Sequence, residues 1–345
     1  MSQETAAAQP SAHHRSAGVG NRRSVRIGTR GSPLARWQTE TFLAQIRAHL
    51  AQGGASFGFA ADDFSIEIIA VTGDQIQDRR LAEIGGKGMF AKEIHEALSD
   101  QRIDCAVHSL KDLETSFPDG IMLACTLARE DARDALILRP GIADDHSVTS
   151  FADFRSLLPQ GAQIGSASLR RQAQLLHVRP DLQVTLLRGN VRTRLDRVRS
   201  GGIDATLLAV AGVKRLGFAD EISLMLDPAI MLPAAGQGIV GVTARADDSD
   251  LRALLASIED RRARIAATAE RSLLAALDGS CRTPIGAYAQ LDESDQLHLT
   301  GLAARGDGTF LRRCSLTGSA SDAARLGAAL GAQLRRESPP DIFLD

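Results

Sequence analysis

Short apolar runs alternate with longer segments of helical periodicity through most of the chain. Residues 24–27 alternate between polar and apolar side chains as in a strand, and a glycine-containing turn follows. Ser32 and Pro33 then supply an N-cap and a proline at the first helical position, and the helix they begin has Leu43 and Ile46 on one face. The same patterns predict buried strands at residues 66–71 and 104–110 and a helix at residues 89–98. Alternating strands and helices predict a mostly parallel α/β sheet.

A second unit repeats this order in the middle of the chain. Residues 164–169 resemble residues 27–34, because both run from an Ile-Gly pair through hydroxyl side chains to a leucine. An Ile-Asp pair also opens an apolar strand in each unit. We therefore expect two similar α/β domains. Residues 239–242 predict one more strand, and a charged helix from about residue 250 to residue 277 leads to a loop and a third, smaller α/β domain.

Length and composition favour a multidomain globular protein over membrane, nucleic-acid-binding and disulfide-rich proteins. The 345 residues are more than twice the roughly 150 residues of a typical domain, which predicts two or three domains. The longest nearly uninterrupted apolar run, residues 205–213, is far shorter than the roughly 20 residues of a membrane span. The net charge of -2 gives no general attraction to nucleic acid. Four widely spaced cysteines argue against a zinc site or a disulfide scaffold and favour a reducing cytoplasm.

The basic residues are almost all arginine. Only four of the 40 are Lys, which leaves 36 Arg, although a GC-rich genome would also enrich this residue. Between residues 155 and 215, ten Arg and one Lys face three Asp, a local excess of eight positive charges. A nucleic-acid surface is one interpretation, but this stretch has no aromatic side chain on which bases could stack. An Arg-lined cleft for a small polyanion or polycarboxylate is better supported, because guanidinium groups bind carboxylates through two parallel hydrogen bonds.

Three polar turns occupy the positions where open α/β sheets bind ligands, beyond strand ends and at helix N-termini. They are residues 29–32, 108–112 and 166–168. The second turn places Lys111 beside Asp112, a carboxylate that can transfer protons or stabilise a cationic intermediate. A surface ion pair is the simpler interpretation of that turn taken alone, and its histidine is expected to be a core or supporting residue rather than a base.

Cys281 differs from the other cysteines. It lies in a glycine-containing loop beside Arg282, whose charge favours the thiolate, so the thiol could act as a nucleophile or as the attachment point of a covalent cofactor. Cys105, Cys125 and Cys314 lie in apolar contexts that are typical of buried packing residues.

Taken in order from about residue 25 to residue 289, these motifs resemble the porphobilinogen deaminase (hydroxymethylbilane synthase) family. The resemblance rests on eight segments, each weak alone: residues 29–35, 85–90, 106–112, 168–172, 187–190, 208–212, 233–238 and 279–281. It implies a transferase of tetrapyrrole (porphyrin and haem) biosynthesis. Such an enzyme joins four porphobilinogen molecules head to tail, releases ammonia, and hydrolyses the product to linear hydroxymethylbilane.

The resemblance also assigns roles to residues of this sequence. It implies that Cys281 carries one dipyrromethane cofactor through a thioether and that Asp112 is the catalytic acid/base. The implied cofactor-binding residues are Lys111, Ser166, Ser168, Arg170, Arg171 and Arg188. The implied substrate-binding residues are Arg30, Ser32, Lys87, Phe90, Arg194, Arg215 and Gln237. No metal is expected, and the Arg-rich stretch would form one wall of a cleft for a growing polycarboxylate.

The implied fold is α/β with three domains. Two periplasmic-binding-protein-like (type II) domains surround a cleft, and a smaller C-terminal α/β domain carries the cysteine. The predicted division is a disordered tail (1–23), domain 1 (24–128 and 233–256), domain 2 (129–232) and domain 3 (257–345). The resemblance further implies a cytoplasmic monomer with porphobilinogen as its small-molecule substrate and with neither a nucleic-acid nor a membrane partner.

Two rival functions belong to other classes. A non-enzymatic solute-binding protein for a small polycarboxylate would share the two-domain architecture, but its secreted members need a signal peptide, which we do not find in the sequence, and have no use for Cys281. A nucleic-acid binder would show strongly salt-dependent affinity for DNA or RNA, which the enzyme interpretation does not predict.

Overall fold

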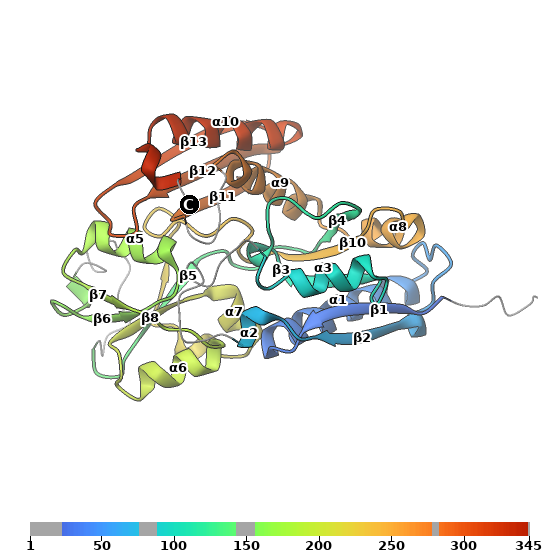
Figure 1. Cartoon of the computed structure of the whole chain (residues 1–345), viewed down its shortest axis with the longest axis horizontal. Coiled ribbons are helices and arrows are strands. Elements are labelled where there is room, and N and C mark those ends of the chain that lie inside the picture. Colours follow the sequence, from blue (N-terminus) through green and yellow to red (C-terminus); the bar gives the residue numbers. More distant parts are fainter. Residues whose placement is uncertain (1–22, 76–87, 143–155, 278–282, 344–345) are drawn as a thin grey trace, which may run out of the picture.

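A computed structural model describes residues 23–75, 88–142, 156–277 and 283–343, which form three α/β domains (Figure 1). The helices and strands of domain 1 are β1 (Val25–Arg30), α1 (Pro33–Ala51), β2 (Phe64–Ile69), α2 (Thr72–Gln75), α3 (Lys92–Ser99), β3 (Cys105–Ser109), β4 (Ile121–Thr126), β10 (Val240–Arg245) and α8 (Ser249–Ser257). The sheet has the order β2-β1-β3-β10-β4. Helices α1 and α8 pack on one face and α3 packs on the other, which buries apolar side chains on both sides of the central strands.

Domain 2 repeats this arrangement. Its elements are β5 (Asp134–Leu138), β6 (Gln163–Gly165), α5 (Leu169–Val178), β7 (Gln183–Thr185), α6 (Val191–Arg199), β8 (Ala205–Ala209), α7 (Val210–Arg215) and β9 (Leu224–Leu226). The strand order is β7-β6-β8-β5-β9, and each strand runs in the same sense as its counterpart in domain 1. Helix α5 covers one face and helices α6 and α7 cover the other. The predicted similarity of the two domains is confirmed.

The chain crosses between these domains twice. We call residues 127–133, which lead from β4 to β5, the first crossing segment, and residues 227–239, which lead from β9 to β10, the second. The strand that pairs antiparallel within each sheet, β10 or β5, directly follows a crossing segment. Domain 1 is therefore discontinuous in sequence, with its last strand supplied after domain 2. The strands of the two sheets fall within the predicted domain limits, whose exact positions remain predictions.

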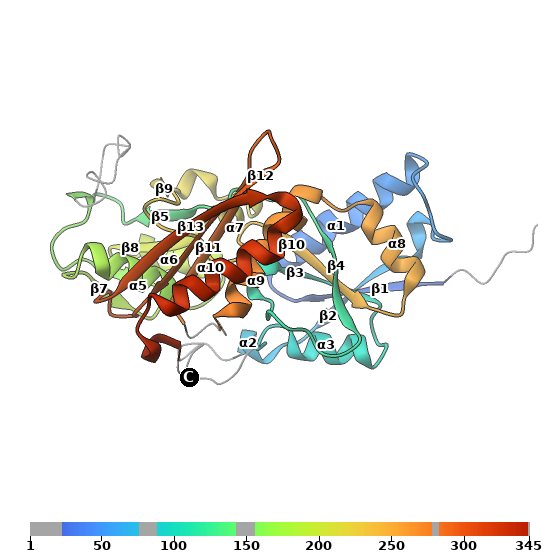
Figure 2. The same ribbon diagram turned by 90° about the horizontal axis from the view of Figure 1, so that it is seen from above.

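Domain 3 lies over the junction of the other two, as Figures 1 and 2 show. It contains α9 (Arg261–Ala276), β11 (Ile285–Leu291), β12 (Gln296–Ala304), β13 (Leu311–Ser319) and α10 (Ala323–Arg336). Leu297 and Leu299 of β12 point toward the two helices, whereas Leu302 and Ala304 point to the opposite face and pack near Ala173 of α5. Because successive side chains of β12 point to opposite faces of the sheet, the strand contributes both to the core of domain 3 and to its contact with domain 2.

One sequence prediction is confirmed with an exception, and two need correction. Four of the five strands in each sheet run in the same sense, as a mostly parallel sheet requires, but β10 and β5 run antiparallel to both of their neighbours. The strand predicted as buried at residues 66–71 is β2, an edge strand in which Ile68 is 54% exposed. The single helix predicted for residues 250–277 is two helices, because Asp260 accepts a hydrogen bond from the backbone nitrogen of Ala263 (2.7 Å) and caps a new helix there.

Two further predictions concern the cysteines and the N-terminal tail. Cys105, Cys125 and Cys314 are free and buried, as predicted. Arg23, which we placed in the disordered tail, forms ion pairs with Asp104 and Asp248. Within the described ranges, no helix is both long and apolar enough to cross a membrane.

Candidate active site

A cavity of about 750 Å³ lies between domains 1 and 2, beyond the ends of β1, β3 and β8. Eight of the predicted site residues line it: Arg30, Ser32, Phe90, Lys111, Asp112, Arg171, Arg188 and Arg194. The described charged side chains of its wall are six cations and two carboxylates: Arg30, Lys111, Arg171, Arg188, Arg192 and Arg194, with Asp74 and Asp112. This excess of positive charge suits a ligand that carries several carboxylates.

Helix N-termini add to this positive wall. Ser32 caps α1, where its hydroxyl oxygen accepts from the nitrogen of Ala35 (3.3 Å), and Asn190 caps α6, where its side chain accepts from the nitrogen of Thr193 (2.9 Å). Both caps line the cavity. Because the free N–H groups and dipole of a helix N-terminus favour negative charge, both helix starts are suited to an anionic ligand.

Asp112 is the acidic group best placed for proton transfer. It ends a short turn directly after β3, and its side chain is 33% exposed. The nearest guanidinium nitrogen of Arg30 lies 3.7 Å from its Oδ2. Arg30 also donates to Asp74 (Nε to Oδ2, 3.1 Å) and lies over the ring of Phe90, 4.2 Å from its centroid. These contacts hold a cation beside Asp112 and leave the carboxylate open to the cavity.

His108 precedes this turn and is buried against the sheet. Its Nε2 lies 3.0 Å from Oγ1 of Thr243, and burial, with smaller effects from His95 and Arg30, lowers its pKa to about 3. A ring that is buried, bonded to a neighbouring strand and lowered in pKa is a weak proton acceptor, which suits a core or supporting position better than that of a base.

Two of the other cations, Lys111 and Arg194, are partly buried beside further positive charge. Burial and the charge of Arg171 lower the pKa of Lys111 to about 8. Burial also lowers the pKa of Arg194 to about 10, with further contributions from Arg171 and Arg188. Each shift means that the charged form is disfavoured in this cavity, so carboxylates of a ligand would relieve an existing repulsion.

Five described residues that the sequence predicted for the site do not line the cavity: Ser166, Ser168, Arg170, Arg215 and Gln237. Lys87 and Cys281 lie outside the described residues. Arg170 is buried and paired with Asp134 (2.8 Å). Arg215 donates to the carbonyl of Gly238 (2.8 Å) and lies over the ring of Trp37. In the described structure these side chains shape the wall.

Sequence reasoning missed several residues of the site. Arg192 and Asn190 lie in the Arg-rich stretch but were not assigned roles, although a polar residue before an apolar-periodic segment is a recognisable cap signal. Asp74 carried no local signal, because it reaches Arg30 only after β1 and β2 have paired. Asp134 stands at the head of a buried strand, but its partners Arg171 and Gln237 are distant in sequence and gave no local signal.

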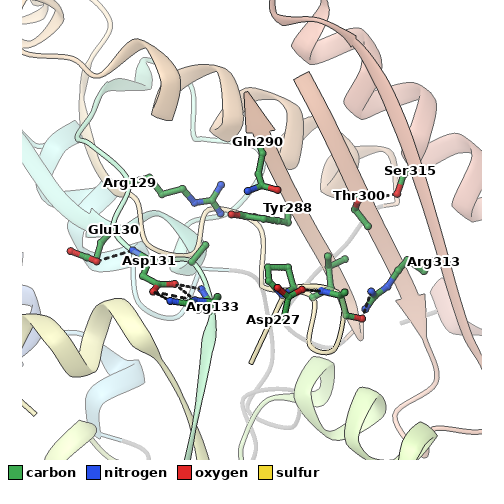
Figure 3. Close-up of a pocket in the computed structure, with 14 residues that line it drawn as sticks. Arg129, Glu130, Asp131, Arg133, Asp227, Tyr288, Gln290, Thr300, Arg313 and Ser315 are labelled. Atoms are coloured by element: carbon green, nitrogen blue, oxygen red, sulfur yellow. Dashed lines mark hydrogen bonds and ion pairs between the residues drawn. The ribbon is translucent and has the colours of Figure 1, made fainter. Parts of the chain in front are cut away.

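A second cavity, of about 840 Å³, lies between the crossing segments and the sheet of domain 3 (Figure 3). None of the predicted site residues that the structure describes lines it. Its arginines already have partners in the protein: Arg129 pairs with Glu270, Arg133 pairs with Asp131, and Arg313 donates to the carbonyl of Ala229. The smaller cavity therefore remains the candidate active site.

In the described ranges no group of three or more His, Cys, Asp or Glu could hold a metal ion.

Two family profiles match the chain. Residues 25–253 match "Porphobilinogen deaminase, dipyromethane cofactor binding domain" and residues 264–336 match "Porphobilinogen deaminase, C-terminal domain". The porphobilinogen deaminase of Paracoccus denitrificans (strain Pd 1222) is 46% identical over 319 residues, which cover 92% of this chain and 96% of that protein. The chloroplastic porphobilinogen deaminase of Oryza sativa subsp. japonica is 43% identical over 324 residues, which cover 92% and 85%.

Among solved structures, the VFT2 domain of Bordetella pertussis BvgS (a double mutant) is 16% identical. The match covers 68% of this chain and 85% of that one with a TM-score of 0.38. A score this low adds nothing to the fold described above.

Proposed function

Because the chain belongs to the porphobilinogen deaminase family, we propose that its cleft assembles a linear tetrapyrrole from porphobilinogen. Four porphobilinogen molecules are joined head to tail on a dipyrromethane primer attached to Cys281, four ammonia molecules leave, and water frees hydroxymethylbilane. The protein is thus a hydroxymethylbilane synthase, a transferase of porphyrin and haem biosynthesis. The observation that carries this proposal is the cavity wall, which contains six cations and only two carboxylates, Asp74 and Asp112.

The cavity wall fits a dipyrromethane group, each ring of which bears an acetate and a propionate. Arg171 lines the cavity, is only 6% exposed, and has a buried Nε for which the described structure holds no acceptor. Such a donor needs an acceptor, and a ligand carboxylate would supply it. When bound, the group provides the primer on which the chain is extended. The residues proposed to hold it are Cys281, Lys111, Ser166, Ser168, Arg170, Arg171 and Arg188.

Asp112 is proposed as the acid/base of each condensation. The amino group of the aminomethyl substituent of porphobilinogen must leave as ammonia, while its methylene carbon stays on the ring to form the new bond. A carboxylate within reach can guide the proton and stabilise the positive pyrrole that remains. Its partial exposure and the neighbouring Arg30 support this role. The substrate carboxylates are proposed to bind Arg30, Ser32, Lys87, Arg194, Arg215 and Gln237, with Phe90 beside them.

Intact mass measured during exposure to porphobilinogen tests this proposal. We expect the resting protein to exceed its sequence mass by two linked pyrroles and then to gain mass in steps of one pyrrole. Asp112→Asn should lower kcat about 10²–10⁴-fold, because a positioned proton-transfer group contributes about that much. Asp100→Asn, which changes a carboxylate that is 64% exposed, is the control and should keep the wild-type rate.

Two results would contradict the proposed function or the proposed role of Asp112. Saturable binding of porphobilinogen without turnover and without covalent mass would support the solute-binding alternative. A turnover rate for Asp112→Asn within threefold of wild type would remove Asp112 from the mechanism.

We further propose that the chain works as a monomer in the cytoplasm, with its domain boundaries near residues 128, 232 and 256. The family resemblance and the distribution of strands among the three sheets support these assignments. Light scattering on the purified protein should give the mass of one chain, 36.7 kDa plus cofactor.

A further inference from the structure

We propose that Asp134 is a positioning residue that fixes two cations on opposite sides of the cleft, Arg171 of domain 2 and Lys111 of domain 1. The proposal rests on the proposed function, since both cations are expected to bind pyrrole carboxylates. Asp134 begins β5, directly after the first crossing segment, and is fully buried. It does not line the cavity.

Three donors converge on this carboxylate. Its Oδ2 accepts from Nη2 of Arg170 (2.8 Å), and its Oδ1 accepts from Nη2 of Arg171 (2.7 Å) and from Nε2 of Gln237 (2.8 Å). Burial raises the pKa of Asp134, but the charges of Arg170 and Arg171 and the hydrogen bonds outweigh burial and hold the pKa well below its ordinary value. The group is therefore an anion at any working pH.

The first consequence concerns Arg171. Asp134 holds Nη2 and the carbonyl of Leu207 in β8 holds Nη1 (2.8 Å), so the plane of the guanidinium is fixed by two protein acceptors. The Nε edge is left without an acceptor in the described structure, on a residue that lines the cavity. Asp134 thereby fixes the orientation in which Arg171 presents its remaining N–H donors.

The second consequence reaches Lys111 through Gln237. The amide nitrogen of Gln237 donates to Asp134 and to the carbonyl of Ala132 (2.7 Å), which turns the amide oxygen toward the ammonium of Lys111 (3.4 Å). The negative charge of Asp134 also offsets the repulsion between Lys111 and Arg171. One buried carboxylate thus orients a cation on each wall, beside the proposed catalytic Asp112.

Replacing Asp134 by Asn should disturb both cations. An amide has one acceptor oxygen, so its nitrogen would face one donor (Arg170) or two (Arg171 and Gln237), and the two adjacent guanidinium groups would lose their counter-charge. Asp134→Glu keeps the charge but moves it by one methylene, so it separates the effect of charge from that of position. Asp104→Asn is the matched control. Asp104 is 4% exposed and accepts from the backbone of Arg26 (2.8 Å) and from Arg245 (3.1 Å), and it does not line the cavity.

The first measurement is the pH dependence of reductive methylation at Lys111, read by peptide mass spectrometry on the protein as purified. The charged groups that act on Lys111 are Arg171, Asp112, Asp134 and Arg170. Since the carboxylate of Asp134 raises the pKa of Lys111, Asp134→Asn should lower the labelling midpoint by about 0.5–1 unit relative to the wild-type protein, whereas Asp134→Glu and Asp104→Asn should leave it in place.

The second measurement is steady-state kinetics with porphobilinogen, expressed per folded molecule. We expect Asp134→Asn to raise KM about tenfold or more, as expected when a charge-assisted contact is lost, and Asp134→Glu to raise it by less. An unchanged KM in both folded variants, or an equal rise in Asp104→Asn, would overturn the proposal. If Asp134→Asn does not fold, wild-type KM in Asp134→Glu alone would overturn it. A wild-type protein without turnover would refute the proposed function, while the labelling result would still report on Asp134.

Discussion

Glu270 of α9 joins all three parts of the molecule, so its replacement tests the packing directly. The side chain is fully buried. Its Oε1 accepts from Nη1 of Arg129 (2.6 Å) and from the nitrogen of Ala289 (2.7 Å), and its Oε2 accepts from the nitrogen of Gly236 (2.6 Å) and from Nη2 of Arg129 (3.3 Å). Arg129 and Gly236 belong to the two crossing segments and Ala289 belongs to β11, so one carboxylate ties both crossings to domain 3.

Glu270→Gln preserves the size of the side chain but not this pattern. Its amide nitrogen would face two donors, one of the two backbone nitrogens would lose its acceptor, and the buried charge of Arg129 would lose its partner. Breaking a buried ion pair by removing one partner costs about 3–5 kcal/mol, which includes about 1–3 kcal/mol for a buried donor left unsatisfied. We expect the free energy of unfolding to fall by about this amount in urea denaturation followed by far-UV circular dichroism.

Asp341→Asn provides the control for this loss. Asp341 pairs with Arg305 (2.7 Å), but the two side chains are 60% and 39% exposed, so its removal should cost no more than about 1 kcal/mol. A double-mutant cycle with Arg129→Met should show strong coupling to Glu270→Gln and none to Asp341→Asn. If Glu270→Gln unfolds within about 1 kcal/mol of wild type, the buried tie does not stabilise the domain junction and the reasoning fails.

Two further predictions concern packing and pH. Gly327→Ala should lower the free energy of unfolding by about 1–3 kcal/mol, because its Cβ would lie 2.2 Å from the carbonyl oxygen of Ala269 where α10 crosses α9. Gly306→Ala, whose Cβ would meet its nearest side chain at 3.7 Å, should be neutral, and equal melting temperatures for the two variants would count against the crowding. The pKa of Lys111 is lowered from 10.5 to about 8, so the folded state binds fewer protons than the unfolded state between these values, and stability should rise with pH in that window. Lys111→Met should lack this rise when urea denaturation is compared at pH 7.5 and 10, and an identical slope would refute the shift.

Local signals predicted those parts of the fold that local interactions decide. Ser32 and Pro33 marked the start of α1, and the repeat of residues 27–34 at residues 164–169 correctly indicated two similar domains. The sense of β10 and β5 was not readable, because it depends on the chain crossing between domains. The break between α8 and α9 was missed for a different reason: Asp260 carried the cap signal, but the charged periodicity continued across it.

The site shows the same limit. Asp112 and Lys111 could be assigned because they follow a buried strand in a turn at the sheet edge. Asp134 could not, since its partners come from helix α5 and from a crossing segment about a hundred residues further along the chain. The geometry that selects a donor for the ligand is thus set by contacts distant in sequence, even where the donor itself is locally evident.

Contacts distant in sequence also decide which arginines of the Arg-rich stretch, residues 155–215, face the cavity. Its ten arginines predicted a positive wall, and the wall is positive, but only four of them line the described cavity: Arg171, Arg188, Arg192 and Arg194. Others are neutralised by acids, such as Arg170 by Asp134 and Arg199 by Glu221, and both of these acids lie outside the stretch. A count of charge along the sequence therefore gives the sign of the wall, whereas acids from elsewhere in the fold decide which guanidinium groups remain for a polycarboxylate. Substitutions at Arg171 or Arg194 should consequently affect ligand binding, and those at Arg199 should not, although all three contribute equally to the local charge.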